Sequence, residues 1–393
     1  MPIVNYKYYP YIFSTDEVTA IEYKTESGGY WSVRDWQDGK KYWYCAVFHG
    51  VGLDAVDFTK LIPNDILTDE STYIVLSAEY EIFTKIAKPI YTNLIQRLRL
   101  NPKRIILISE DVDECNIVKE VAASYNLDTI NVEWSLVHER GANRQQHELI
   151  PNNIVTADIL AKKTYKKCFL NFNGRWRSHR PCFVALLHCM NLLDKGFVSL
   201  GKADDNLNWN NTFDTFSKLI EEDQEMYSLL INNKDSILNI PDLYLDTTNL
   251  ITNRNMIVHP DINHNDTLKL YEDSYFSVVT ETNFFGRIGK HLTEKAFKPI
   301  AYRHPFILMS DQHTLALFRK LGYKTFHPFI DESYDNEPND TKRLKMILNE
   351  VNRLCNLSEP ELFEFIDNVK EITKFNYELL INKPKFTHCH KML

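Results

Sequence analysis

Short apolar runs alternate with amphipathic stretches through the first half of the chain after residue 70. Three apolar runs predict buried parallel strands: YIVLSAE (73–79), RIILISED (104–111) and TINVEWSLVH (129–138). Two stretches between them have helical spacing: residues 82–100, interrupted or started by Pro89, and residues 115–127. This strand–helix alternation indicates an α/β doubly wound fold.

The second half repeats the alternation after a polar connection at residues 141–166. Its apolar runs predict strands at 166–173, 197–202, 274–282, 305–310 and 324–330. Its amphipathic stretches predict helices at 179–196, 211–237, 291–302, 313–322 and 358–383. We expect Gly196 and Gly322 to end two of these helices, because glycine is the common residue just after a helix.

The N-terminal residues differ from the rest of the chain. Residues 1–60 are rich in Tyr and Trp and alternate over short stretches, which predicts a β-rich part. We therefore predict an N-terminal domain at 1–160, a second α/β domain at 161–357 and a C-terminal helix at 358–393 that packs back across the domains. Two Rossmann-like domains facing a cleft would bind ligands at the carboxyl ends of their strands.

The composition narrows the class of protein. A chain of 393 residues, 44% of them hydrophobic, favours two globular domains. A net charge of −8 disfavours a general nucleic-acid coat protein but permits a local basic cleft. Seven cysteines with no CxxC pair argue against a disulfide framework or a zinc site. Without a signal pattern or a long apolar run, we expect a cytoplasmic protein with no membrane span.

A basic turn follows the first strand of the second half. The segment NFNGRWRSHR (171–180) leaves a strand and opens a helix, and it contains Arg175, Arg177 and Arg180. Helix N-termini attract anions, and arginine adds permanently charged bidentate donors. The segment therefore predicts a phosphate site, with a solvated basic turn as the alternative.

A second basic element, KHLTEKAFKPIAYRHPFIL (290–308), also opens a helix. Thr293 can cap that helix, and Glu294 suits its first turn. Lys295 lies near the start of a mostly apolar helix, which predicts that its ammonium group points into a cleft. Glu281 adds a carboxylate at the end of the preceding strand. The alternative is that Glu294 is an ordinary first-turn carboxylate.

Two segments resemble one enzyme family. YFSVVTETNFFGRIGKHLTEKAFKPIAYRHPFIL is similar to the donor-binding motif of the α1,3-fucosyltransferases, in which Thr-Glu-Lys opens a helix. FLNFNGRWRSHRPCFVALLHCMNLLDKGFVSLGK resembles an earlier segment of that family, which ends in Gly-Lys. The strings R-W-R-x-H-R and T-E-K-x-F-K-P-I also resemble glycosyltransferase-like proteins of phages and large viruses. The resemblance does not cover residues 1–160.

The resemblance implies a glycosyltransferase of the two-domain GT-B architecture, with an acceptor-binding N-terminal domain and a donor-binding second domain. The donor would be a UDP- or GDP-linked sugar. Glu294 would hold the ribose and Lys295 the diphosphate, and Thr293 would be a further donor-binding residue of the same string. Arg180, with Arg175 and Arg177, would hold the diphosphate from the other side, and Glu281 would line the sugar pocket. The family's Glu-Asn-Ser reads Glu-Thr-Asn at 281–283, which leaves the donor sugar open.

Arginine and lysine can stabilise a leaving diphosphate without a metal, so we expect a metal-independent, inverting transfer. The string Asp111-Val-Asp113 would suit a metal-dependent alternative. An inverting transfer needs a base from the acceptor domain. We favour Asp111 and Glu79, which follow predicted strands. The other candidates are His49, Glu81, Glu110, Glu133 and His138.

The acceptor is a separate question. The Asn-, Ile-, Tyr- and Lys-rich, glycine-poor chain resembles T-even-like phage proteins, which glycosylate hydroxymethylcytosine in DNA. Basic spots of the first half, such as Lys40-Lys41 and Arg97 with Arg99, could contact DNA. Aromatic residues near 31–44 could stack on a flipped base, with packing in a β-rich core as the alternative. A phage-encoded chain would then act in the host cytoplasm with glucose or arabinose, whereas a glycan is the competing acceptor.

Two other functions remain as alternatives: that of a nucleotide-sugar epimerase and that of a non-catalytic nucleotide- or DNA-binding protein. Hydrolase and dehydrogenase functions are disfavoured, because no G-x-S-x-G or G-x-G-x-x-G motif occurs.

Overall fold

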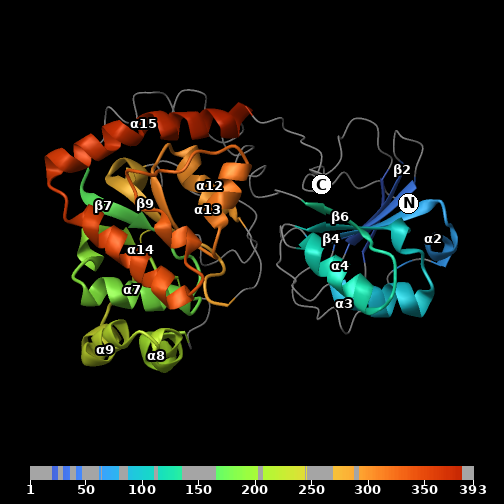
Figure 1. Cartoon of the computed structure of the whole chain (residues 1–393), viewed down its shortest axis with the longest axis horizontal. Helices are drawn as coiled ribbons and strands as arrows, with labels where there is room; N and C mark the ends of the chain where they lie inside the picture. Colours follow the sequence, from blue (N-terminus) through green and yellow to red (C-terminus); the bar gives the residue numbers. More distant parts are fainter. Residues whose placement is uncertain are drawn as a thin grey trace. The chain divides into compact units, whose positions relative to one another are not determined.

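The chain divides into two compact units: residues 1–137 with 288–291 and 384–393, and residues 138–287 with 292–383. The computed structural model describes residues 20–24, 30–35, 41–46, 62, 64–78, 87–109, 114–134, 165–201, 207–243, 245, 269–286 and 292–382. Each unit contains a sheet with parallel strands and helices packed on it (Figure 1). The predicted α/β class is therefore confirmed, while the predicted cleft and the roles of the two domains stay predictions.

The first unit contains a six-stranded sheet whose strand order follows the sequence. The strands are β1 (Ala20–Lys24), β2 (Tyr30–Asp35), β3 (Lys41–Ala46), β4 (Thr72–Ala78), β5 (Ile105–Ser109) and β6 (Asn131–Trp134). β1, β2 and β3 pair antiparallel, and β3 to β6 pair parallel. The described strands confirm the β-rich N-terminal part and the three predicted parallel strands.

The described helices of this unit pack on one face of its sheet. They are α2 (Asn64–Thr68), α3 (Ala87–Pro89) with its π-helical continuation (Ile90–Gln96), and α4 (Glu114–Ser124). Ile74 and Leu76 of β4 share one buried cluster with Ile66, Leu94 and Val118 of the helices. Right-handed crossovers that advance in one direction place every helix on the same face. The described helices therefore cover one face of this part of the sheet.

The second unit has a four-stranded parallel sheet with the order β10-β9-β7-β8. Its strands are β7 (Lys167–Asn171), β8 (Gly196–Val198), β9 (Ser274–Thr280) and β10 (Phe306–Met309). From β7 the chain crosses through α7 (His179–Cys189) to β8 at one edge of the sheet. From β9 it crosses through α12 (Glu294–Ala301) to β10 at the other edge. Right-handed crossovers then place α7 and α12 on opposite faces, as Figure 1 shows. The neighbours β7 and β9 thus form a topological switch point, where open α/β sheets bind ligands.

The other helices of the second unit are α8 (Trp209–Ser217), α9 (Gln224–Asn232), α10 (Lys234–Leu238), α13 (Thr314–Lys320), α14 (Asp340–Cys355) and α15 (Glu359–Asn382). The predicted helix at 211–237 is divided into α8, α9 and α10. Gly322 follows α13 with a φ of 92°, which confirms its predicted role as a helix stop. α14 has no counterpart among the predicted helices.

Two predictions for this unit are wrong. The helix expected at 179–196 ends at Cys189, and Gly196 opens β8 instead. A Cβ atom at Gly196 would lie 2.4 Å from the ring of Phe169, so the close approach of β8 to β7 requires glycine. The strand expected at 324–330 is a turn with a cis His327–Pro328 bond, and proline cannot donate a ladder hydrogen bond.

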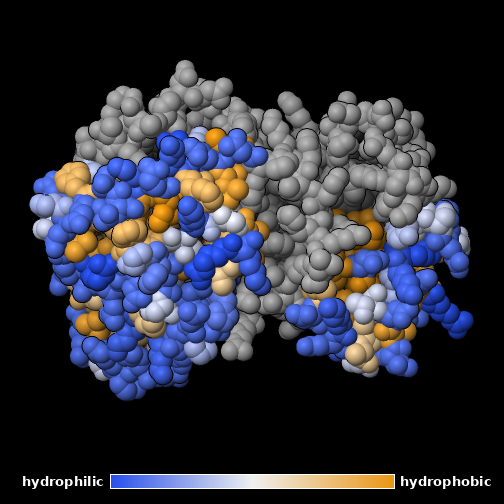
Figure 2. Space-filling view, turned by 45° about the horizontal axis from the view of Figure 1, so that its top comes forward, coloured by the Kyte–Doolittle hydropathy of each residue, from blue (hydrophilic) through white to orange (hydrophobic). Residues whose placement is uncertain are grey.

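The second unit buries its central strand completely, because all seven residues of β9 are buried. α15 packs against α12 in this unit, and its predicted packing across both domains stays a prediction. The face of the unit seen in Figure 2 is mostly hydrophilic. Among the described residues, the large apolar side chains that are exposed are Ile231, Phe363 and Phe375. Among the described helices, none is both long and apolar enough to span a membrane.

Candidate functional site

The predicted donor-side residues lie at the carboxyl ends of β7 and β9, the switch point of the second sheet. Arg175 and Arg177 lie on the turn after β7, and Arg180 lies in the first turn of α7. Glu281 directly follows β9, and Thr293 caps α12. The structure therefore brings together, within one unit, two segments that lie about a hundred residues apart, as the pair Arg180 and Glu281 shows with a separation of 101.

The carboxylate of Glu281 fixes the start of α12. Its two oxygens accept hydrogen bonds from the Thr293 backbone N–H at 2.9 Å and from the Thr293 hydroxyl at 2.5 Å. The same hydroxyl oxygen accepts a hydrogen bond from the backbone N–H of Lys295 at 3.3 Å, which confirms the predicted helix cap. Glu281 is 1% exposed, so its buried carboxylate supports the start of α12 from inside the fold.

Lys295 and Glu294 form the accessible end of this arrangement. The Lys295 Nζ atom lies 2.9 Å from Glu294 Oε1 and 3.0 Å from Thr293 Oγ1. Both side chains are about one quarter exposed, at 20% for Lys295 and 27% for Glu294. A partly exposed ion pair at a helix N-terminus can open at small cost. Opening of the pair makes the ammonium group of Lys295 available to an anion.

Arg180 holds the two halves of the site together. Its side chain is 2% exposed, and Nη2 donates to the carbonyl oxygens of Thr280 and Glu281 at 3.1 Å each. Nη1 donates to the carbonyl oxygen of Arg175 at 3.0 Å. The resemblance implied that Arg180 contacts the diphosphate. Nη1 and Nη2 bind backbone carbonyls, which gives Arg180 a positioning role between the arginine turn and the end of β9, whereas its buried Nε atom has no hydrogen-bond partner among the described residues. The contact of Arg180 with the diphosphate stays a prediction.

His179 supports the same carbonyl group. Its Nε2 atom lies 3.0 Å from the Glu281 carbonyl oxygen, and the ring is 5% exposed. Burial, together with the charge of Arg180, lowers the pKa of His179 to about 3. The imidazole is therefore neutral near pH 7. Because a carbonyl oxygen only accepts, the neutral ring carries its proton on Nε2. His179 did not figure among the predicted site residues.

Arg175 and Arg177 are exposed on the turn, and in the part of the chain that the structure describes neither guanidinium has a hydrogen bond or ion pair. Partial desolvation of the Arg177 guanidinium is the main cause that lowers its pKa, and the positive charge of Arg175 is the second cause. Between them Trp176 points inward, with its ring centroid 5.1 Å from that of Trp209 on α8. The turn is thus anchored by an apolar side chain while two cations face solvent.

Buried amides connect the ends of the three strands. Asn171 Nδ2 donates to the Val278 carbonyl oxygen at 2.7 Å, and Asn173 Nδ2 donates to the Ser199 carbonyl oxygen at 2.9 Å. The Thr280 hydroxyl donates to Asn173 Oδ1 at 2.5 Å. Buried polar groups with this many partners fix one arrangement of the backbone. An Asn-containing turn after the strand was the one signal for this network in the sequence analysis.

The loops after β7 and β8 also touch directly. A Cβ atom at Gly201 would lie 2.7 Å from the Gly174 carbonyl oxygen, whereas a Cβ atom at Gly174 would meet nothing within 4 Å. The Gly201 N–H donates to the Asn173 carbonyl oxygen at 2.7 Å. The loop after β7, which carries the arginine turn, can therefore lie this close to the loop after β8 because residue 201 is glycine.

The charges of the site do not cancel. Four cations (Arg175, Arg177, Arg180 and Lys295) stand against the two carboxylates of Glu281 and Glu294, which leaves a formal surplus of two positive charges. Burial lowers the pKa of Arg180 to about 10, so its guanidinium stays charged near pH 7. Burial raises the pKa of Glu281, and the charge of Lys295 opposes that rise. Any protonation of Glu281 increases the positive surplus.

The predicted catalytic bases cannot be placed. Asp111 and Glu79 lie outside the described residues, as do His49, Glu81, Glu110, Asp113 and His138, and for Glu133 only the backbone is described. No group of three His, Cys, Asp or Glu residues suited to a metal ion occurs within the described ranges. The expectation of a metal-independent reaction stays a prediction.

Comparisons with known proteins do not assign a family. No protein-family model matches the chain, and no curated protein is similar to it. One solved structure that it matches is the N-terminal domain of Candida albicans trehalose-6-phosphate phosphatase, with 10% identity and a TM-score of 0.36. That match covers 79% of this chain and 68% of the other. At such a TM-score it carries no conclusion about fold or function.

Proposed function

We propose that the second unit binds a nucleotide diphosphate sugar at the β7–β9 switch point and that the protein is a glycosyltransferase. The observation that carries this proposal is that two arginines after β7, whose guanidinium groups have no partner among the described residues, lie at the same end of the sheet as the Thr293-Glu294-Lys295 helix start after β9. These are the segments whose sequences resemble the donor-binding region of the α1,3-fucosyltransferases.

The charge of the site supports a diphosphate ligand. The diphosphate of a nucleotide sugar carries two negative charges, which match the formal surplus of two positive charges at the site. In the proposed complex, Arg175 and Arg177 approach the diphosphate from the β7 side, and Lys295 approaches it from the start of α12. Glu294, released from its pair with Lys295, accepts hydrogen bonds from ribose hydroxyl groups.

The proposed reaction breaks the bond between the sugar C1 atom and the diphosphate oxygen, whose electron pair stays with the departing diphosphate. The cations of the site stabilise the charge that develops there. An acceptor hydroxyl oxygen forms the new bond to C1, and its proton passes to a base. Asp111 and Glu79 remain the proposed bases, and an inverting outcome remains part of the proposal.

The acceptor is proposed from the sequence alone. Hydroxymethylcytosine in DNA is the first candidate, with a glycan as the alternative. A mobility shift at low salt with hydroxymethylated and unmodified duplexes separates them. We expect a shift with the modified duplex, and no shift with either duplex would remove DNA as the acceptor.

Calorimetric titration of the purified chain with UDP and with GDP tests the donor site. We expect saturable binding of one of them, together with slow hydrolysis of the corresponding nucleotide sugar. Binding without hydrolysis or transfer would favour a non-catalytic nucleotide-binding protein, and interconversion of the free nucleotide sugar would favour an epimerase. The absence of binding by both nucleotides would overturn the donor site.

A further inference from the structure

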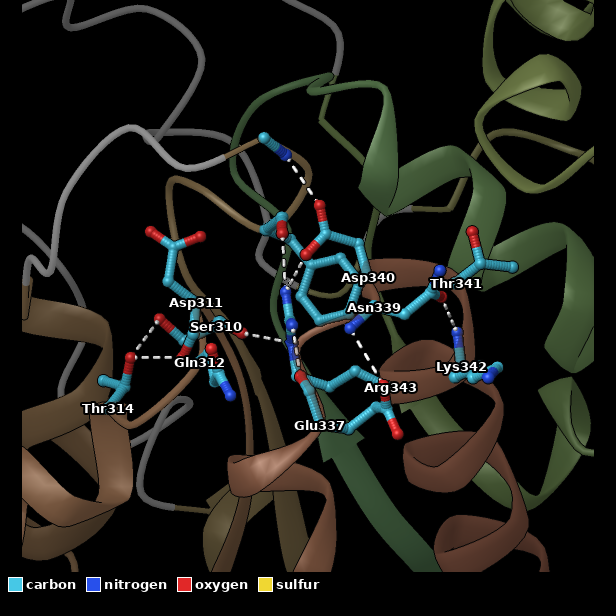
Figure 3. A network of polar contacts seen from close by, with 12 residues as sticks. Ser310, Asp311, Gln312, Thr314, Glu337, Asn339, Asp340, Thr341, Lys342 and Arg343 are labelled. Carbon is cyan, nitrogen blue, oxygen red and sulfur yellow. Dashed lines mark hydrogen bonds and ion pairs between the residues drawn. The ribbon is translucent and has the colours of Figure 1, made fainter. Parts of the chain in front are cut away.

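The start of α14 holds the loop that follows β9 (Figure 3). The backbone N–H of Gly286 donates to Asp340 Oδ2 at 2.8 Å, and Arg343 Nη2 donates to Asp340 Oδ1 at 2.5 Å. Asp340 therefore uses both carboxylate oxygens to join the loop to the helix. Its side chain is 26% exposed, whereas that of Arg343 is 2% exposed.

The guanidinium group of Arg343 joins three separate segments. Nε donates to the Ser310 carbonyl oxygen at 3.1 Å, just after β10. Nη1 donates to the Glu337 carbonyl oxygen at 2.9 Å, just before α14. Nη2 donates to the Phe284 carbonyl oxygen at 3.0 Å, in the loop after β9. Only the planar fork of arginine can reach three carbonyl groups in this way.

Phe284 connects this network to the candidate site. The Arg343 guanidinium lies 4.8 Å from the centroid of the Phe284 ring, which is 1% exposed. The centroid of the same ring lies 6.2 Å from that of His179, which binds the Glu281 carbonyl oxygen. Phe284 also follows Glu281 by three residues. The position of the loop therefore affects the position of Glu281 in two ways: through the backbone between the two residues, and through the contact of the Phe284 ring with His179.

The chemistry of the network points to a positioning role. Buried ion pairs are seldom more stabilising than apolar side chains of similar volume, so stability alone does not explain this one. A network with this many hydrogen bonds does fix a loop in one place. We infer that Asp340 and Arg343 are positioning residues for the nucleotide site. They hold residues 282–286 so that Glu281 keeps Thr293 and Lys295 in one geometry, in which Lys295 meets the diphosphate. This inference rests on the proposed function.

The test compares two substitutions at the start of the same helix. Asp340→Asn keeps the shape but leaves one oxygen acceptor for two donors, the Gly286 N–H and Arg343. We expect its affinity for UDP or GDP to fall about tenfold in calorimetry. We also expect faster amide exchange at Gly286. Arg343→Lys keeps the charge but loses the fork, and it should weaken binding in the same way.

Asn339→Ala is the matched control. Asn339 Oδ1 accepts a hydrogen bond from the Lys342 backbone N–H at 2.8 Å and caps α14. This substitution should lower the melting temperature while leaving nucleotide affinity and Gly286 exchange unchanged.

The outcomes separate the inference from the proposed function. Unchanged affinity in Asp340→Asn, or an equal loss in Asn339→Ala, would overturn the positioning role and leave the donor site intact. If the unsubstituted chain binds neither nucleotide, the donor site and the positioning role fail together.

Discussion

The guanidinium of Arg180 donates a hydrogen bond to the backbone carbonyl oxygen of Glu281 at 3.1 Å, across 101 residues of sequence. This contact links the first turn of α7 to the end of β9. Because Arg180 is 2% exposed, its role in the fold can be separated from that of its exposed neighbours in the arginine turn.

Arg180→Lys should destabilise the second unit by about 3 kcal/mol, because one ammonium group cannot satisfy the carbonyls of Arg175, Thr280 and Glu281. Urea denaturation measures the loss. The same exchange at the exposed Arg175 should change stability by less than about 0.5 kcal/mol. Equal effects at the two positions would show that Arg180 is not the structural member of the turn.

Arg175→Gln combined with Arg177→Gln should weaken nucleotide binding by about a hundredfold, because two charge-assisted contacts to the diphosphate are lost. The fold should not lose stability, since neither side chain has a partner within the described residues. The affinity of the double variant should depend less on salt than that of the unsubstituted chain. Calorimetry at two salt concentrations measures both quantities. Lys88→Gln combined with Lys119→Gln, at exposed positions on α3 and α4, is the charge-matched control.

Lys295→Ala should abolish measurable binding of UDP or GDP while the chain stays folded. The side chain is 20% exposed, and its ion pair with Glu294 is solvated enough to contribute little stability. Calorimetry and a melting curve test the two parts of this prediction. If the variant unfolds, Lys295 is a structural residue and its assignment to the diphosphate fails.

The pKa of His179 predicts acid sensitivity. The folded-state pKa is about 3 and the ordinary value is 6.5, so between these values the unfolded chain binds the proton. Stability should therefore fall as the pH drops below about 6.5, by up to about 1.4 kcal/mol per pH unit from this residue. Burial raises the pKa of Glu281 and acts in the opposite direction.

His179→Gln isolates the histidine contribution, because a glutamine amide can still donate to the Glu281 carbonyl oxygen. Denaturation midpoints at pH 7 and pH 4.5 provide the comparison. The variant should lose less stability than the unsubstituted chain over this interval. An identical loss would show that His179 does not titrate between the folded and unfolded states.

Substitution by alanine should be harmful at one of two glycines on facing loops and neutral at the other. Gly201→Ala places a Cβ atom 2.7 Å from the Gly174 carbonyl oxygen, so the arginine turn must move and both stability and nucleotide affinity should fall. Gly174→Ala meets no atom within 4 Å and should leave both unchanged. Melting curves and calorimetry on the pair measure the contrast. A neutral Gly201→Ala would mean that the contact does not set the position of the turn.

Local sequence patterns predicted several strands of both sheets and, at the candidate site, the start of α12. The apolar runs located β4, β5, β7 and β9, and the string Thr293-Glu294-Lys295 predicted a capped helix start. These features depend on neighbours in sequence, so a single segment contains the information.

The features that the sequence did not predict depend on contacts between segments that are far apart in the sequence. The amides of Asn171 and Asn173 pair with residues on β9 and after β8, and Arg343 acts through Phe284, 59 positions away. The strand order is also set by pairing between distant segments. Arg180 could not be told from Arg175 and Arg177 until its burial was known.

The pairing of β7 with β9 has a consequence for how the protein reaches its native state. The segments that meet there are separated by about a hundred residues, and closing so long a loop is entropically costly and slow. Before that closure, the arginine turn and the Thr293 helix start are separate local structures. Nucleotide binding during refolding should therefore appear only with the last, slowest gain of β structure, and a bound nucleotide would report on completed assembly of the second unit.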